Sequence, residues 1–157
     1  MSWFVIVLII TVILRGMGAG IITGVTLITL PARRRLGILQ FANFMRVHYK
    51  EKGVKVYAAT TIVGFILTIV LCTYTFKRSE PVIVSSAIVT SLIATVLGLV
   101  GTAGAFPAMI NLWKLEEDDL LKLTSFLNRF AGWSIFSAIF HTISFVILIV
   151  ALPYTSH

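Results

Sequence analysis

Two ionisable side chains, Arg15 and His141, lie within long apolar stretches of the sequence. A histidine in such surroundings is held as the neutral imidazole, which can accept a proton from an acidic substrate. An arginine nearby can stabilise the anion that forms. Ionisable residues inside apolar spans are costly and commonly mark functional sites. Arg15 and His141 are therefore the leading candidates for anion stabilisation and proton abstraction, the alternative for His141 being a packed histidine bonded to a carbonyl or hydroxyl.

Arg15 needs a partner. It lies about 18 Å along the first apolar stretch if that helix begins near Trp3, at about 1.5 Å per residue. A central arginine costs about 2.5–3.5 kcal/mol on insertion scales, and none of the apolar stretches contains Asp or Glu. We expect its partner to be a carbonyl, a hydroxyl, an aromatic face, an anionic ligand or another subunit. The alternative is an outward shift of the helix that lets Arg15 reach the membrane surface.

Four apolar stretches, at roughly 3–31, 54–76, 82–106 and 131–152, must position these side chains. A hydrocarbon core about 30 Å thick is crossed by about 20 helical residues, so each stretch is long enough. The chain is 58% hydrophobic and 12% charged, with a mean hydropathy of +1.00, unlike a soluble domain. The sequence predicts an all-α integral membrane four-helix bundle with helical cytosolic extensions, forming one domain over residues 1–157.

Basic residues are concentrated in the first and third connections between these stretches. The ten are Arg33, Arg34, Arg35, Arg46, Lys50, Lys52, Lys55, Lys114, Lys122 and Arg129. The second connection has only Lys77 and Arg78. This asymmetry predicts a multi-pass protein with its long basic connections in the cytosol and both termini outside or lumenal. Arginines directly after a span are typical of topology and headgroup contact, so we expect the lipid bilayer, and no nucleic acid, as a partner.

Both long connections show helical patterns. Residues 32–53 have apolar side chains at near-helical spacing, and the segment either lies in the membrane interface or continues into the second span, with Gly53 as the expected break. The four acidic residues 116–119 suit the positive end of a helix dipole better than a metal ion, because they point in different directions. Pro31 and Pro107 are expected to end or kink their helices.

Glycines form two stripes, Gly16–Gly20–Gly24 in the first stretch and Gly98–Gly101–Gly104 in the third. Small residues at such spacing let helix backbones approach closely inside a membrane. We expect both stripes to be close-packing surfaces; the alternative is that they leave room for a flat ligand between helices.

Three segments share a pattern with a known family. They are the glycine-rich first stretch ending in Leu30-Pro31, the sequence Phe106-Pro107-Ala108-Met109-Ile110-Asn111, and the sequence Asn128-Arg129-Phe130-Ala131-Gly132-Trp133. Together they resemble the anthrone-oxygenase-like family of small four-helix membrane proteins. Characterised members oxidise an anthrone to an anthraquinone with molecular oxygen and no evident cofactor. The resemblance implies a cofactor-independent oxidoreductase acting on a lipophilic aromatic substrate.

The matching positions are Asn111, Arg129 and Trp133. The resemblance implies that Asn111 or Trp133 assists Arg15 in stabilising the substrate anion. The family pattern has a histidine about four residues after the tryptophan, followed by an arginine; here the histidine position is Ser137 and the arginine position is apolar. His141 lies one helical turn after Ser137. It can take the place of the family's histidine only if the pocket of this protein is deeper.

Two functional hypotheses are open. In the first, molecular oxygen oxidises a lipophilic small molecule at a site formed by His141, Arg15, Asn111 and Trp133. The resemblance implies that no cofactor is needed, and no metal is expected because Cys72 and the scattered histidines lack ligand spacing. In the second, the chain is a non-catalytic accessory subunit that packs against a larger membrane complex, or a homo-oligomer. The central His141 favours the first, and the lack of an acidic partner for Arg15 favours the second.

Overall fold

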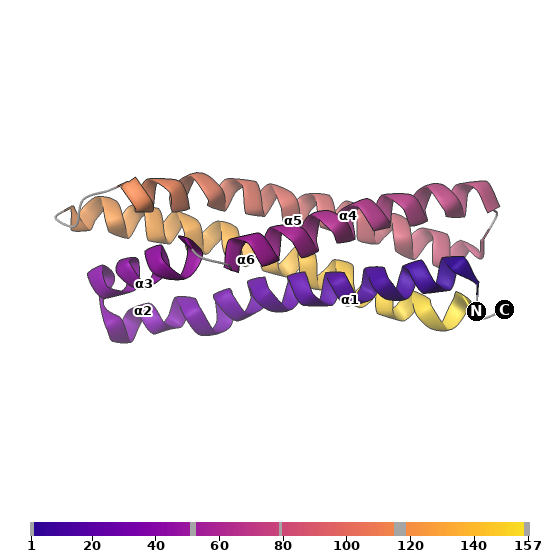
Figure 1. Ribbon diagram of the computed structural model, residues 1–157, viewed down its shortest axis with the longest axis horizontal. Helices are drawn as coiled ribbons and strands as arrows, with labels where there is room; N and C mark the ends of the chain where they lie inside the picture. The colour runs from indigo at the N-terminus through magenta and orange to yellow at the C-terminus, as the bar shows by residue number, and fades with distance from the viewer. Residues whose placement is uncertain (1, 51–52, 79, 115–118, 156–157) are drawn as a thin grey trace.

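The protein is a bundle of long helices that run along one axis (Figure 1). The computed structural model describes residues 2–50, 53–78, 80–114 and 119–155, except for the side chains of 48–50, 53 and 113. The elements are α1 (Trp3–Gly24), η1 (Val25–Thr29), α2 (Leu30–Leu36), α3 (Ile38–Lys50), α4 (Gly53–Arg78), α5 (Val82–Lys114), α6 (Leu120–Ala151) and η2 (Leu152–Thr155). All the regular structure in these ranges is helical, which confirms the predicted fold class.

Four helical stretches are long and apolar enough to cross a membrane. They are Trp3–Leu36, Val54–Arg78, Val82–Leu112 and Leu120–Thr155. The chain is thus a multi-pass membrane protein. The first, third and fourth stretches extend further than the sequence predicted: at about 1.5 Å per residue they reach about 50 Å, beyond a hydrocarbon core of about 30 Å. These stretches are therefore longer than the hydrocarbon core is thick.

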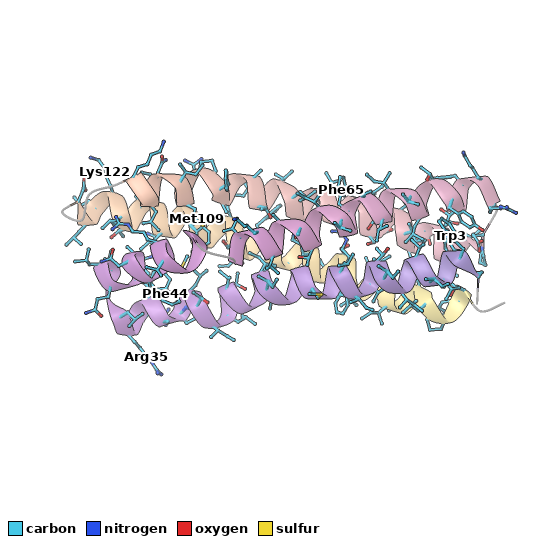
Figure 2. All side chains as sticks on the ribbon, in the orientation of Figure 1. Trp3, Arg35, Phe44, Phe65, Met109 and Lys122 are labelled. Carbon is cyan, nitrogen blue, oxygen red and sulfur yellow. The ribbon has the colours of Figure 1, made fainter. Side chains whose placement is uncertain are left out.

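The two chain termini lie at one end of the bundle, and α2 and α3 lie at the other (Figure 1). Figure 2 shows Trp3 at the terminal end, while Arg35 points away from the bundle at the opposite end. The beginning of α6 and the end of α5 also lie at that opposite end. The most extensive helix packing is between α5 and α6. The basic connections and the chain termini thus lie at opposite ends of the molecule.

Neither Pro31 nor Pro107 ends its helix. Pro31 lacks an N–H and its ring crowds the carbonyl four residues before it. Just before it, η1 forms a wider π turn in which the Leu30 N–H bonds to the Val25 carbonyl, five residues back. This wider turn accommodates the proline, and helical structure continues through α2. Pro107 lies inside α5, which continues to Lys114.

The first connection folds against the bundle. Gly37, with φ of 77°, separates α2 from α3 in a conformation that glycine adopts without strain. Phe41, Ala42 and Met45 on α3 are then buried in an apolar cluster with residues of α5 and α6, such as Leu112. The side of α3 that the sequence predicted to be apolar is divided, because Phe44 and Val47 remain exposed. α4 begins at Gly53, directly after the two residues that the structure does not describe, so the break expected at Gly53 stays a prediction.

An acidic residue caps α6. The Asp119 side chain accepts a hydrogen bond from the Lys122 backbone N–H over 3.0 Å, and its carboxylate lies 2.7 Å from Lys122 Nζ. These hydrogen bonds from Lys122 lower the pKa of the Asp119 carboxyl. Residues 116–118 of the acidic run lie outside the described residues. For Asp119, the predicted role at the helix start is confirmed.

The interior is apolar at both ends and polar in the middle. One buried apolar cluster surrounds Phe41 and Leu127 near α3, and the other surrounds Phe4 and Leu148 near the termini. Between them along the helices lie the buried polar residues Arg15, Thr60, Thr61, Thr68, Ser91, Thr95, Ser134, Ser137, His141 and Ser144. This middle layer is where a membrane interior is most costly to polar groups. It is the part of the fold that needs a functional explanation.

The glycines of α5 allow α6 to approach closely. A Cβ atom added to Gly98 would lie 2.9 Å from the His141 ring, and one at Gly101 would lie 2.8 Å from the Ser137 backbone nitrogen. One added to Gly104 would overlap the Trp133 ring. The expectation of close packing is confirmed for this stripe. In the first stripe only a Cβ atom added to Gly16 would meet a neighbour this closely, the ring of Phe145. One added to Gly20 or Gly24 would have no such neighbour within 4 Å.

Replacing Gly101 with alanine is expected to destabilise the bundle by about 1–3 kcal/mol, as overpacking typically does. The added methyl group would meet the backbone of α6, which cannot move aside as a side chain can. Gly20→Ala is the matched control, since space is open there, and is expected to change stability by no more than about 0.5 kcal/mol. Unfolding in mixed lipid–detergent micelles measures both. Equal stability of the two variants would contradict this packing.

Candidate functional site

Arg15 is held inside the bundle by a hydroxyl of α4. The residue is only 3% exposed, and its Nε and Nη2 atoms donate hydrogen bonds to Thr68 Oγ1 over 3.4 and 3.1 Å. Thr68 donates its own proton to the Gly64 carbonyl oxygen at 2.7 Å, which leaves its oxygen lone pairs for the arginine. Arg15 therefore does not reach the membrane surface. Among the described residues its partner is a neutral hydroxyl, and none of them provides a counter-ion for the positive charge.

His141 lies against the α5 glycine stripe. It is 3% exposed, and its ring occupies the space that the absence of a side chain at Gly98 provides. The ring of Tyr57, from α4, meets it edge-on with 6.2 Å between ring centroids. Arg15 is close enough to interact electrostatically with both His141 and Tyr57. The fold thus brings the two ionisable candidates into one layer, with Tyr57 beside them.

A chain of hydroxyl groups continues from Tyr57 into the α5–α6 interface. Tyr57 Oη lies 2.9 Å from Thr102 Oγ1, which lies 2.9 Å from Ser137 Oγ. Ser137 Oγ in turn donates to the Gly98 carbonyl oxygen at 3.0 Å. Thr102 Oγ1 also donates to this carbonyl oxygen, over 3.2 Å. The hydroxyl of Tyr57 stands at the other end, where it can exchange partners.

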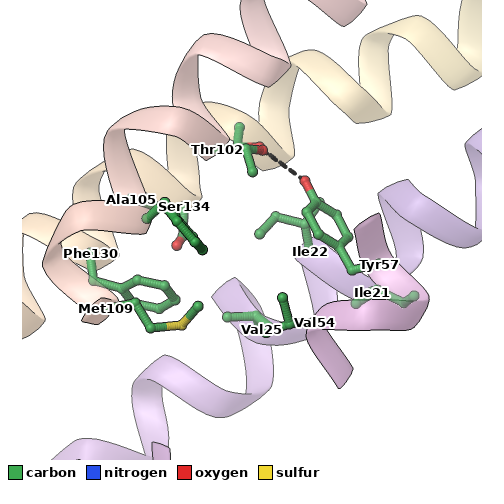
Figure 3. A pocket seen from close by; sticks show the side chains of 12 residues that line it. Ile21, Ile22, Val25, Val54, Tyr57, Thr102, Ala105, Met109, Phe130 and Ser134 are labelled. Carbon is green, nitrogen blue, oxygen red and sulfur yellow. Dashed lines mark hydrogen bonds between the residues drawn. The ribbon is translucent and has the colours of Figure 1, made fainter. Parts of the chain in front are cut away.

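A partly enclosed cavity of about 100 Å³ opens beside these hydroxyls. Figure 3 shows Tyr57, Thr102 and Ser134 at its wall, together with the apolar side chains of Met109 and Phe130. The remaining lining residues are Ile21, Ile22, Val25, Val54, Ala105, Phe106 and Ser137. Five elements contribute to the wall: α1, η1, α4, α5 and α6. The cavity is therefore apolar over most of its surface and carries hydroxyl groups on one side.

Buried polar atoms without a partner gather in the same layer. Among the described residues these atoms are Arg15 Nη1, Thr61 Oγ1, Ser134 Oγ and His141 Nε2. An unsatisfied buried polar atom costs about 1–3 kcal/mol, and more if it is charged. Each such atom in a native structure needs an explanation, and a bound molecule or ordered water is one. With a proton on Nδ1, His141 Nε2 has a lone pair to accept a proton, and Arg15 supplies the positive charge that an anion requires.

The structure does not place Asn111 or Trp133 beside Arg15 and His141. Asn111 is exposed near the end of α5, about 15 Å along the helix from Gly101 at about 1.5 Å per residue. Trp133 lies about 12 Å along α6 from His141 and packs against Gly104 and Phe136 instead. Neither residue lines the cavity. Arg129, the third position matched through the resemblance, is likewise exposed.

Sequence reasoning missed the hydroxyl-bearing residues of the site. The pattern is nevertheless present, since Ser134, Ser137, His141 and Ser144 are spaced three or four residues apart on α6. The same spacing relates Tyr57, Thr61, Gly64 and Thr68 on α4, and Ser91, Thr95, Gly98 and Thr102 on α5. Such spacing places residues on one face of a helix. Three facing polar stripes indicate a polar layer inside the bundle.

Comparison with known proteins gives no match: no family model, no characterised protein and no solved structure is significantly similar to this chain. The resemblance to anthrone oxygenases stays a prediction from the sequence motifs alone. Within the ranges that the structure describes, no three His, Cys, Asp or Glu side chains lie together as metal ligands would. The function must therefore be argued from Arg15, His141 and the cavity.

Proposed function

We propose that this protein binds a lipophilic aromatic molecule within the membrane and oxidises it with molecular oxygen, as the resemblance to anthrone oxygenases implies. The observation that carries the proposal is the buried Arg15, whose Nη1 has no partner and whose charge has no counter-ion among the described residues. An arginine kept in this position at a cost in stability is explained by an anion that forms next to it. His141 is the base that generates this anion.

The proposed chemistry needs no group beyond oxygen. His141 Nε2 takes a proton from the activated CH₂ of an anthrone, and Arg15 stabilises the resulting enolate. The carbanionic carbon transfers electrons to O₂ and forms a C–O bond, and protonation gives a hydroperoxide. The remaining C–H proton and a hydroxide then leave as water while the O–O bond breaks, giving the quinone. One anthrone and one O₂ thus yield one anthraquinone and one water.

The cavity sets a condition on substrate entry. An apolar cavity of about 150 Å³ holds one benzene ring, and the cavity here measures about 100 Å³. A three-ring substrate therefore enters only if the surrounding helices separate. Tyr57 lines the cavity and touches the His141 ring, so its side chain must also turn away before a substrate reaches the base.

Oxygen uptake in liposomes tests the proposed function. Purified protein reconstituted into lipid vesicles is expected to consume one O₂ for each anthraquinone formed from added anthrone, faster than the same vesicles without protein. Val146→Ala, an exposed position on α6, is the control and should keep the wild-type rate. A rate equal to that of empty vesicles would contradict the proposal.

A second candidate function is that of a subunit packed against a larger membrane complex. The observation that favours it is the outward glycine surface of α1. A Cβ atom added to Gly20 or Gly24 would have no described neighbour within 4 Å, which leaves room for another helix. Arg15 does not support this alternative in the way first expected, because it is directed into the bundle.

The proposed orientation places the α2–α3 end in the cytosol and both termini outside or in a lumen. Arg34 and Arg35 are exposed on α2, and Arg33 donates a hydrogen bond of 2.6 Å to Asn128 Oδ1 of α6. The positive charges of two connections therefore gather at one end of the bundle, which supports a cytosolic location for that end.

A further inference from the structure

Ser134 is the one hydroxyl of the cavity wall that lacks a partner. The residue is 1% exposed, and its Oγ is among the buried atoms without a hydrogen bond. The other three hydroxyls at the wall, those of Tyr57, Thr102 and Ser137, bond to one another. In a helix a serine hydroxyl commonly bonds to a carbonyl of the preceding turn, but Ser134 Oγ makes no such bond. Its hydrogen-bonding capacity is therefore unused, although the residue forms part of the cavity wall.

The cavity has a polar side and an apolar side. Ser134 lies one turn before Ser137 on α6, so the hydroxyls of α6 follow one line along the wall. The rest of the wall is apolar and includes Met109, Phe130 and the aliphatic side chains of α1 (Figure 3). A ligand that fits this arrangement is apolar over most of its surface and carries a hydrogen-bonding oxygen at one edge.

The volume limits the part of the ligand that is enclosed. The cavity volume is about 100 Å³. A closed apolar cavity that holds a benzene ring measures about 150 Å³. Because this cavity is only partly enclosed, a single ring can enter and extend through the open side. A single oxygen-bearing ring fits this space better than a fused system.

We propose that Ser134 determines the specificity of the cavity by binding the oxygen of a phenol-like ring, which the surrounding apolar side chains enclose. This inference rests on the proposed function, because the ring bound at Ser134 is taken to be one end of the larger aromatic substrate. It adds a residue and a ligand class that the sequence motifs do not provide. Its test does not require turnover.

The test compares two fluorinated probes of similar size, 4-fluorophenol and fluorobenzene, by ¹⁹F NMR with the protein in lipid nanodiscs. Empty nanodiscs correct for partition into lipid. In the wild type both probes are expected to bind, with the phenol the tighter. Ser134→Ala should weaken phenol binding by about three- to tenfold, the effect of one lost neutral hydrogen bond, and should leave fluorobenzene binding unchanged. Ser125→Ala, an exposed serine on the same helix, is the matched control.

Fluorobenzene also reports whether the Ser134→Ala cavity is still formed, so that misfolding is not mistaken for a lost hydrogen bond. Equal phenol affinity in the wild type and Ser134→Ala would overturn the inference, as would failure of the wild type to bind either probe. The outcome is independent of the oxygen-uptake test: phenol binding through Ser134 without turnover contradicts only the proposed oxidation. Turnover without a Ser134 effect contradicts only this inference.

Discussion

Arg15→Met is expected to leave the protein as stable as the wild type, or more stable by up to about 4 kcal/mol, while abolishing substrate oxidation. Replacing buried charges by apolar residues of similar volume is often neutral or stabilising. In this bundle Arg15 has one hydroxyl partner and one unsatisfied nitrogen. A residue that lowers stability and is needed for activity has the signature of a functional group. Unfolding in mixed micelles and oxygen uptake measure the two effects.

Thr68→Val provides the control for this prediction. It removes the hydroxyl that accepts hydrogen bonds from Arg15 and leaves the cation buried without a partner. We expect a loss of stability of about 1–3 kcal/mol, opposite in sign to the effect of Arg15→Met. If Arg15→Met instead destabilises the bundle as much as Thr68→Val does, the arginine is a structural element of the core and the proposed anion site is wrong.

His141→Gln is expected to lower kcat by about 10²–10⁴-fold, the usual contribution of a general base. Glutamine keeps hydrogen-bonding groups in the space beside Gly98 but cannot take up a proton at neutral pH. Because the base acts in the transition state, kcat and kcat/KM should fall together while KM changes little. Steady-state oxygen uptake over a range of anthrone concentrations separates these parameters.

The outcome that contradicts a base role is a raised KM with an unchanged kcat. That result would mean that His141 only shapes the binding site through its contacts with Gly98 and Tyr57. Val146→Ala again serves as the control on α6.

The fold could be predicted because the length and the hydropathy of a stretch indicate whether it crosses a membrane. The length and hydropathy of the four stretches predict helices, and the bundle follows from their need to bury small and polar surfaces. The ends of the helices were harder to predict. Pro107 suggested an end to the third span, yet α5 continues to Lys114 because its last turns pack against α3 and α6. That contact is not visible in local sequence.

The site was predictable only in part. Arg15 and His141 stand out because a charge inside an apolar stretch is rare, and the structure places them in one layer. The role of Tyr57 could not be read from its position near the start of a span, because it depends on which residues of α5 and α6 the fold brings to it. Asn111 and Trp133 came from the family resemblance, and neither is among the residues that line the cavity. Motif matching does not record which helix face a residue occupies.

Native mass spectrometry of the protein released gently from its own membrane tests most directly whether the buried polar layer is a ligand site. The account predicts a monomer or homo-oligomer that carries a small aromatic molecule, and predicts that this mass is absent from Arg15→Met. Release together with larger subunits, without any bound small molecule in the wild type, would contradict it. The chain would then be an accessory subunit, and the outward glycines of α1 would be the surface to examine.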